Sequence, residues 1–286
     1  MIPQQQAQDL HFSFVQSLAS NLSAGSIELP SFPKAVLRLR QVLEDENSTT
    51  AQIVQLLSVE PALSARLIQI ANSAAMGGAN QITDLNTVVN RMGRQMVQSA
   101  AMSYAMKQMR ESQTLDVSQV LLDDLWHTST QVAALCYVLA KKYTKLNRDQ
   151  ALMVGLMHGI GKLYILGQAQ NHPELFSDPG AMEGILQEWH AGIGSAILQT
   201  WNFPDNMSYA VANFEQTDRV HEDGADFTDV LILSFMLAHF LTAGEDGELQ
   251  LDDVPAAVKL GVSAHDLMEL LIEFEEQIAS LRHALG

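Results

Sequence analysis

Three histidines, His127, His158 and His190, could carry metal chemistry in this sequence of 286 residues. Each lies in an apolar segment of helical periodicity. The apolar residues on the same helical stripes are Val120, Ala134 and Val138 for His127, Ala151, Val154 and Ile165 for His158, and Leu186, Ile197 and Trp201 for His190. This pattern predicts that all three rings point into the protein. Imidazole nitrogen is a good ligand for zinc, iron and nickel, although a single inward histidine is more often a hydrogen-bonded core residue.

The carboxylates that a hydrolase would need beside these histidines are missing. Metal-dependent hydrolysis of phosphate esters generally uses carboxylates, because they offset the cation charge and help to position water. Gly159 follows His158 directly and has no side chain to offer, and the apolar segment Leu231–Leu241 contains no carboxylate. Lys162, one helical turn after His158, could meet a phosphate as a point charge or could lie at the surface, as most lysines do. We therefore expect a shared imidazole pocket without acidic side chains.

Other reactive motifs fail on their spacing. Gly155 and Gly161 have five residues between them, and Lys162 is followed by leucine, so the segment is not a phosphate-binding P-loop. Tyr164 stands where a dinucleotide-binding motif has its third glycine. Cys136 is the single cysteine and lies in an apolar run, which favours a buried core thiol over a nucleophile. With one cysteine, an intrachain disulfide and a multi-cysteine zinc site are excluded.

The elements that must position these residues are helices. Apolar positions recur at helical spacing throughout, and no period-2 run bounded by a hairpin turn is present, so the fold class is all-α. Helix starts are predicted after residues that commonly cap helices or occupy their first turn, namely Thr49 or Thr50, Pro61, Asp84, Asn147 and Ser263. A polar break at Arg110–Asp116 divides the chain into an N-terminal helical lobe, residues 1–112, and a bundle-like C-terminal lobe, residues 113–286.

Two further segments have alternative interpretations. A methionine-rich segment could form an adaptable docking face, or it could be a helix packed in the core of the first lobe. Its methionines are Met92, Met96, Met102, Met106 and Met109. The acidic stretches Asp218–Asp229 and Gly244–Asp253 lack the ligand spacing of an EF-hand and are expected to be solvated surface loops.

Composition restricts the partners and the location. Sixteen Lys and Arg residues face thirty-three Asp and Glu residues, which gives a formal net charge of −17. This charge disfavours nucleic acid and anionic membranes as partners. Met1–Asp9 has none of the features of a targeting signal, and the most apolar windows are too short or too interrupted to span a bilayer. The expected location is the cytoplasm.

Several segments resemble the HDOD domain, a bacterial helical module related to HD-type metal-dependent phosphohydrolases. The resemblance begins with LPSFPKAVLRLRQVLEDENSTTAQIVQLLSVEPALSARLIQIANSAAMG at residues 29–77. It continues through residues 82–106, LWHTSTQVAALCYVLAK at 125–141 and ALMVGLMHGIGKLYIL at 151–166, and ends near residues 188–215. Its most specific parts are Pro61-Ala62-Leu63 and Ile70-Ala71-Asn72-Ser73. The resemblance implies an HD-like helical bundle whose catalytic motif is degenerate.

Position by position, the resemblance preserves imidazoles and loses carboxylates. His127 matches the first histidine of an HD site, and His158 matches the histidine of the His-Asp pair, where Gly159 replaces the aspartate. Phe235 lies near the position of a later aspartate, and His190 matches a position that is often histidine. Many relatives have a His-His pair where this chain has Phe214-Glu215. The resemblance therefore implies that His127, His158 and His190 are a remnant metal site without catalytic residues.

The resemblance implies a noncatalytic signalling or regulatory module that acts by binding another, unidentified signalling protein. No cofactor is expected beyond a weakly bound divalent transition metal. One alternative is an active metal-dependent phosphohydrolase of nucleotides or phosphate esters, with the three histidines around one cation. Another is a sensor that binds a nucleotide or anion in the inherited pocket, with Lys162 as its contact.

Overall fold

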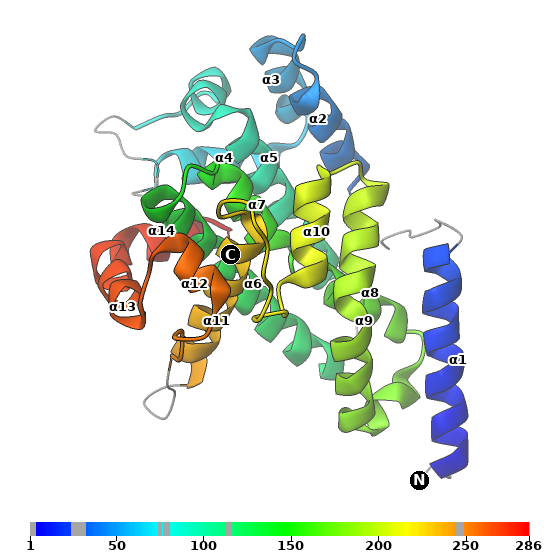
Figure 1. Ribbon diagram of the computed structural model, residues 1–286. Helices are drawn as coiled ribbons and strands as arrows, with labels where there is room; N and C mark the ends of the chain where they lie inside the picture. Colours follow the sequence, from blue (N-terminus) through cyan, green and yellow to red (C-terminus); the bar gives the residue numbers. More distant parts are fainter. Residues whose placement is uncertain are drawn as a thin grey trace.

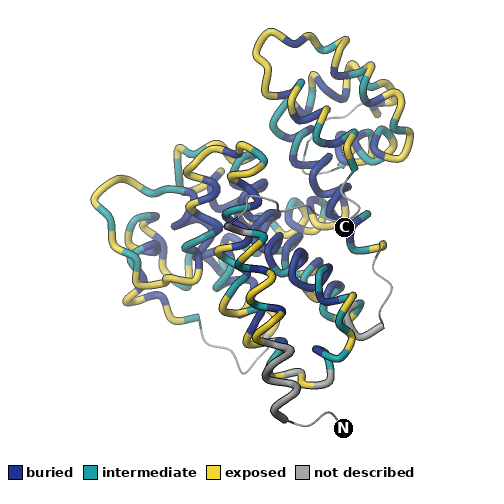
Figure 2. The backbone as a smooth tube through the Cα atoms, turned by 90° about the vertical axis from the view of Figure 1, so that its right-hand side faces the viewer, coloured by how far each residue is buried: buried dark blue, intermediate teal, exposed yellow. Residues whose placement is uncertain are grey.

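The protein was analysed as a computed structural model that describes residues 4–23, 33–73, 76, 81–112, 116–243 and 249–285. The described residues form helices joined by turns, and no strand occurs among them, which confirms the all-α prediction. Figure 1 shows the helices, and Figure 2 shows that buried residues line their inner faces while exposed residues lie on loops and outer faces.

The helices are as follows: α1 (Gln4–Ser23), α2 (Lys34–Glu44), α3 (Thr50–Ser58), α4 (Pro61–Ala71), α5 (Leu85–Glu111), α6 (Asp116–Tyr143), α7 (Arg148–Met157), α8 (Ile160–Ala169), the 3-10 helix η1 (Pro173–Ser177), α9 (Pro179–Thr200), α10 (Asp205–Asn213), α11 (Phe227–Ala243), α12 (Pro255–Leu260), α13 (Ala264–Glu273) and α14 (Glu275–Leu285). Among the described residues, no helix is both long enough and apolar enough to cross a membrane.

Side-chain caps begin several helices where the sequence predicts them. The Thr49 hydroxyl accepts a hydrogen bond from the backbone N–H of Gln52, and Ser263 forms the same kind of capping box with Asp266. Asp84 caps α5, and Asn147 caps α7. These side chains satisfy backbone donors that have no partner within the helix, so the helix starts follow from local chemistry.

Helix α6 lies at the centre of the larger group of helices (Figure 1). It packs against α7, α11 and α14, while α9 packs between α8 and α10. Residues 132–140 of α6 are buried on every side. Cys136 lies in this stretch as a buried thiol, as predicted, and burial raises its pKa to about 12.

The other group surrounds α5, which contacts α2, α3 and α4. All five methionines of the methionine-rich segment are buried in this helix, so the core interpretation is correct and the docking-face interpretation is wrong. Gly93 interrupts the helix with a φ of 73°, a conformation that glycine adopts without strain.

Contacts cross between the two predicted lobes. Helix α1, which belongs to the first lobe by sequence, lies along α9 and η1 (Figure 1). The Arg40 guanidinium of α2 donates to the carbonyl oxygens of Trp201 and Asn202, where α9 ends, and lies 4.0 Å from the centre of the Phe203 ring. The division into residues 1–112 and 113–286 stays a prediction.

Candidate functional site

His158 lies at the junction of two helices. Helix α7 ends at Met157 and α8 begins at Ile160, so His158 and Gly159 form the corner between them. The ring is 3% exposed, as its stripe predicts, and its Nδ1 lies 2.6 Å from the carbonyl oxygen of Gly155. Burial lowers the His158 pKa to about 4, so the ring is neutral at physiological pH. Nδ1 therefore donates its proton to Gly155, and Nε2 carries the lone pair.

His190 on α9 is fully buried, and its partner is a carboxylate that the sequence analysis missed. Its Nε2 lies 3.1 Å from Oε1 of Glu215, just after α10, while its Nδ1 is buried and has no partner in the described part of the chain. The hydrogen bond with His190 lowers the Glu215 pKa. The expectation of a pocket without acidic side chains is thus wrong for Glu215, although that side chain remains 44% exposed.

Aromatic rings pack against both imidazoles. The Phe214 ring makes edge contacts with His158 and His190, at centroid distances of 5.3 and 5.8 Å. Phe235 of α11 lies 5.7 Å from the His158 ring and 4.9 Å from the Phe214 ring. The family resemblance puts Phe235 near the position of a later aspartate, and in the structure its ring packs against the His158 ring.

Lys162 is half-buried beside this cluster. Burial lowers its pKa, and the charges of Glu215 and Glu183 oppose that shift. Its positive charge also contributes to the lowered pKa of His158. The cluster therefore already contains a cation of its own, and Glu215 interacts with both that cation and His190.

His127 lies elsewhere. Its side chain is exposed, so the predicted inward orientation is wrong. Together with His239 and Arg282 it lines a cavity of about 370 Å³ formed by α6, α11 and α14. Val120 shares its stripe and is 64% exposed, which identifies this stripe as an outer face near the start of α6. The structure thus brings His158 and His190 together and leaves His127 apart.

Gly159 shows how closely the corner is packed. A Cβ at this position would lie 2.6 Å from Leu125 Cδ1 and 2.9 Å from Ser129 Oγ. An aspartate there would require both side chains to move. Gly161 is more restricted, because its Cβ would lie 1.9 Å from the backbone oxygen of His190. Gly161 therefore allows α8 and α9 to approach closely, and Gly159 allows the corner to pack against α6.

These residues do not fit a hydrolytic metal centre. His158 Nε2 is a suitable donor, but the carboxylate of Glu215 is engaged by His190, and the Lys162 ammonium adds positive charge. Among the described residues, one cluster of three side chains places metal-ligating atoms within 4.8 Å of one another. Its members are His221, Asp226 and Asp229. The imidazole cluster does not meet that condition.

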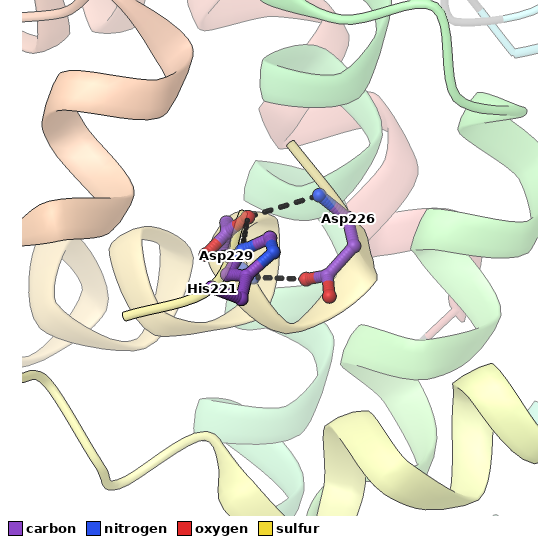
Figure 3. Close-up of side chains that lie close together, drawn as sticks. All are labelled: His221, Asp226 and Asp229. Atoms are coloured by element: carbon purple, nitrogen blue, oxygen red, sulfur yellow. Dashed lines mark hydrogen bonds and ion pairs between the residues drawn. The ribbon is translucent and has the colours of Figure 1, made fainter. Parts of the chain in front are cut away.

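The His221, Asp226 and Asp229 cluster, drawn in Figure 3, joins the segment before α11 to the start of that helix. Asp226 accepts from the backbone N–H groups of Thr228 and Asp229, and Asp229 accepts from the N–H of Asp226, so the two carboxylates form a reciprocal cap. Asp229 is fully buried, so the prediction that the whole of Asp218–Asp229 is a solvated surface loop is wrong for this residue. In the other acidic stretch, residues 244–248 lie outside the described residues.

Arg219 already supplies the positive charge in this cluster. Its Nη1 lies 3.1 Å from Asp229 Oδ1, and its Nη2 lies 2.5 Å from Asp226 Oδ2. His221 Nε2 lies 3.0 Å from Asp229 Oδ2. Burial alone would raise the Asp226 pKa, but the hydrogen bond and charge of Arg219 lower it. With an internal guanidinium on both carboxylates, the cluster fits a structural ion network better than a cation site.

Comparison with known proteins agrees with the fold. A protein of Shewanella amazonensis SB2B, provisionally named a metal-dependent phosphohydrolase, has a crystal structure that aligns with a TM-score of 0.79 and 27% identity, over 96% of this chain and 99% of that chain. An HDOD domain protein of unknown function from Geobacter sulfurreducens aligns with a TM-score of 0.65 and 21% identity, over 94% and 96% of the two chains.

A curated relative, an uncharacterized protein of Treponema pallidum (strain Nichols), is 23% identical over 255 residues, which are 84% of this chain and 47% of that protein. The chain thus spans about half the length of this relative. Residues 29–217 match the HDOD domain, in agreement with the segments that carry the resemblance. Since this match covers more than half of the sequence, the chain belongs to the HDOD domain family.

Proposed function

We propose that this protein is a noncatalytic regulatory module that acts by binding another signalling protein, on a scaffold derived from an HD phosphohydrolase. The observation that carries this proposal is the burial of the two clustered imidazoles. His158 and His190 are 3% and 0% exposed, and the Phe214 ring contacts both. A hydrolytic centre needs access for water and substrate, so the burial of both rings supports a noncatalytic role.

The charges around the imidazoles support the same conclusion. A metal-dependent phosphohydrolase generally uses anionic ligands, yet the one carboxylate in contact with the pair is held by His190. Loss of ligands or of their supporting groups typically lowers metal affinity or activity by about 10- to 100-fold for each change. Lys162 and Glu215 interact with each other, so the lysine is also a poor contact for the anion of a nucleotide sensor.

Metal content and phosphatase activity test the noncatalytic half of the proposal. The purified full chain should contain a substoichiometric amount of transition metal, and added Mn²⁺, Mg²⁺ or Zn²⁺ should produce no turnover of a generic phosphate ester. His158→Gln and His127→Gln are the matched pair, since one changes a buried and the other an exposed imidazole. Metal-dependent turnover that is lost in His158→Gln but kept in His127→Gln would refute the proposal.

The interaction half needs a separate measurement. Crosslinking in cells of the source organism, followed by mass spectrometry, should attach the full chain to a signalling protein. Recovery of the chain alone, at an expression level where the crosslinker captures known complexes, would contradict this half without restoring the hydrolase.

A further inference from the structure

A separate surface cavity of about 320 Å³ lies between α4 and α5, which carry none of the residues of the imidazole cluster. Its lining residues are Ala62 and Arg66 from α4 and Tyr104, Lys107, Gln108 and Glu111 from α5. Two of these side chains are cations and one is a carboxylate, in a chain with a formal net charge of −17. The lining thus carries one more cation than carboxylate, while the charges of Glu60 and Glu111 both act on the hydroxyl of Tyr104.

The guanidinium of Arg66 is partly removed from water, and its hydrogen bonds within the protein do not fully replace those to water. The residue is half-buried, and burial lowers its pKa. Its Nη2 is buried and meets no acceptor among the described residues, while its Nη1 is 3.5 Å from Oε1 of Gln69. A buried donor that lacks an acceptor is costly, and the cost is larger for a charged group. An anion in the cavity would offset the charge of this guanidinium.

Lys107 adds a second positive charge to the same cavity. It is also half-buried, and its pKa is lowered first by burial and then by the charge of Arg66. The charge of Glu111 opposes this shift, and an anion near both cations would favour their charged forms further. Glu111 is exposed and lies at the cavity as the opposing charge.

Tyr104 provides a neutral donor. Gln108 Nε2 donates to the Tyr104 hydroxyl oxygen at 2.6 Å, so the hydroxyl hydrogen is left to point toward another acceptor. Guanidinium, ammonium and phenol groups are the donors that bind phosphate and carboxylate oxygens in proteins.

We propose that the cavity lined by Arg66, Tyr104 and Lys107 binds a small oxyanion, a phosphate or a carboxylate group. This site goes beyond the proposed regulatory function and does not depend on it. The anion would bridge α4 and α5 and would give a module without catalysis a small-molecule input.

Isothermal titration of the full chain with inorganic phosphate at neutral pH tests the site, with ionic strength held constant by chloride. A parallel titration with acetate separates the two sources of the oxyanion chemistry. Saturable binding of either anion is expected. Absence of saturable binding for both anions would overturn the proposal.

Four variants locate the site. Arg66→Gln and Lys107→Gln should each weaken binding by about tenfold or more, the effect of losing one charged hydrogen bond. Glu111→Gln, which removes the opposing carboxylate, should tighten it. Arg38→Gln removes the same charge from an exposed position on α2 and should leave the dissociation constant unchanged.

An equal loss in Arg38→Gln and Arg66→Gln would show that the anion responds only to net charge, and would refute the site. Circular dichroism checks the fold of each variant. If Arg66→Gln does not fold, Lys107→Gln and Glu111→Gln still decide the question, because they must change affinity in opposite directions.

Discussion

The backbone of Gly161 faces the carbonyl oxygen of His190 so closely that a Cβ on Gly161 would lie 1.9 Å from that oxygen. Gly161 belongs to α8, which begins just after the buried His158, and the buried His190 belongs to α9. Any side chain at position 161 must therefore push the helix bearing His190 away from the corner bearing His158.

Gly161→Ala should destabilise the protein by about 3 kcal/mol or more, because backbone atoms must move to admit the methyl group. Urea unfolding followed by circular dichroism measures the change. Gly184→Ala is the matched control at an exposed position of α9, where an added Cβ meets nothing within 4 Å. It should stabilise by about 1 kcal/mol through helix propensity. A similar small effect for both substitutions would contradict the close approach.

Acid should destabilise the protein through His158. The folded-state pKa is lowered from 6.5 to about 4 by burial, so the unfolded chain binds the proton more readily. The stability that this residue contributes is present above the unfolded value and is lost as the pH falls between these two values, by up to about 3 kcal/mol. Urea unfolding across this range checks the slope.

His158→Gln is the control for that slope, since glutamine does not titrate. The pH dependence between 6.5 and about 4 should become shallower in the variant than in the parent protein. Identical slopes would mean that the ring is not held neutral in the folded state.

Arg219→Met should destabilise the protein by about 3 to 5 kcal/mol, because it leaves the buried Asp229 carboxylate without its main cationic partner. Unfolding midpoints measured with and without Zn²⁺ check both parts of the argument. Zn²⁺ should leave the parent protein unchanged, because Arg219 holds both carboxylates, and should restore part of the lost stability in the variant. Arg38→Met is the exposed control. Strong stabilisation of the parent protein by Zn²⁺ would contradict the structural assignment of this cluster.

Cys136 should resist alkylation. Burial raises its pKa to about 12, and only the thiolate reacts. Iodoacetamide at mildly alkaline pH should leave the folded chain unlabelled over the time in which the urea-unfolded chain is fully modified. Mass spectrometry gives a clear answer, because the sequence has a single cysteine.

Local chemistry explains why the helix starts were predictable. Thr49, Asp84, Asn147 and Ser263 each bond to a backbone N–H two or three residues later, so the cap and its partner are adjacent in sequence. The same signal was available before α11, where Asp226 and Asp229 stand three residues apart and form a reciprocal cap. Its place in an acidic stretch concealed it.

The site was less predictable because its partners come from distant helices. The inward orientation of His127 was predicted from Val120, Ala134 and Val138 on its stripe, but residues 132–140 are buried on every side and cannot indicate which face is inward. Val120 is apolar and yet 64% exposed, so its residue type favoured the wrong orientation. Glu215 reaches His190 across 25 residues, and its sequence position marked only a departure from the family pattern.

Arg40 couples the position of α2 to that of α9, which matters for any partner that binds the N-terminal helices. Its guanidinium donates to the carbonyl oxygens of Trp201 and Asn202, just after α9, and pairs with Glu44 one turn along its own helix. A displacement of α2 must either break these bonds or move the C-terminal end of α9, the helix that carries His190. The side chain of Arg40 thus links α2 to the helix that carries one of the two buried imidazoles.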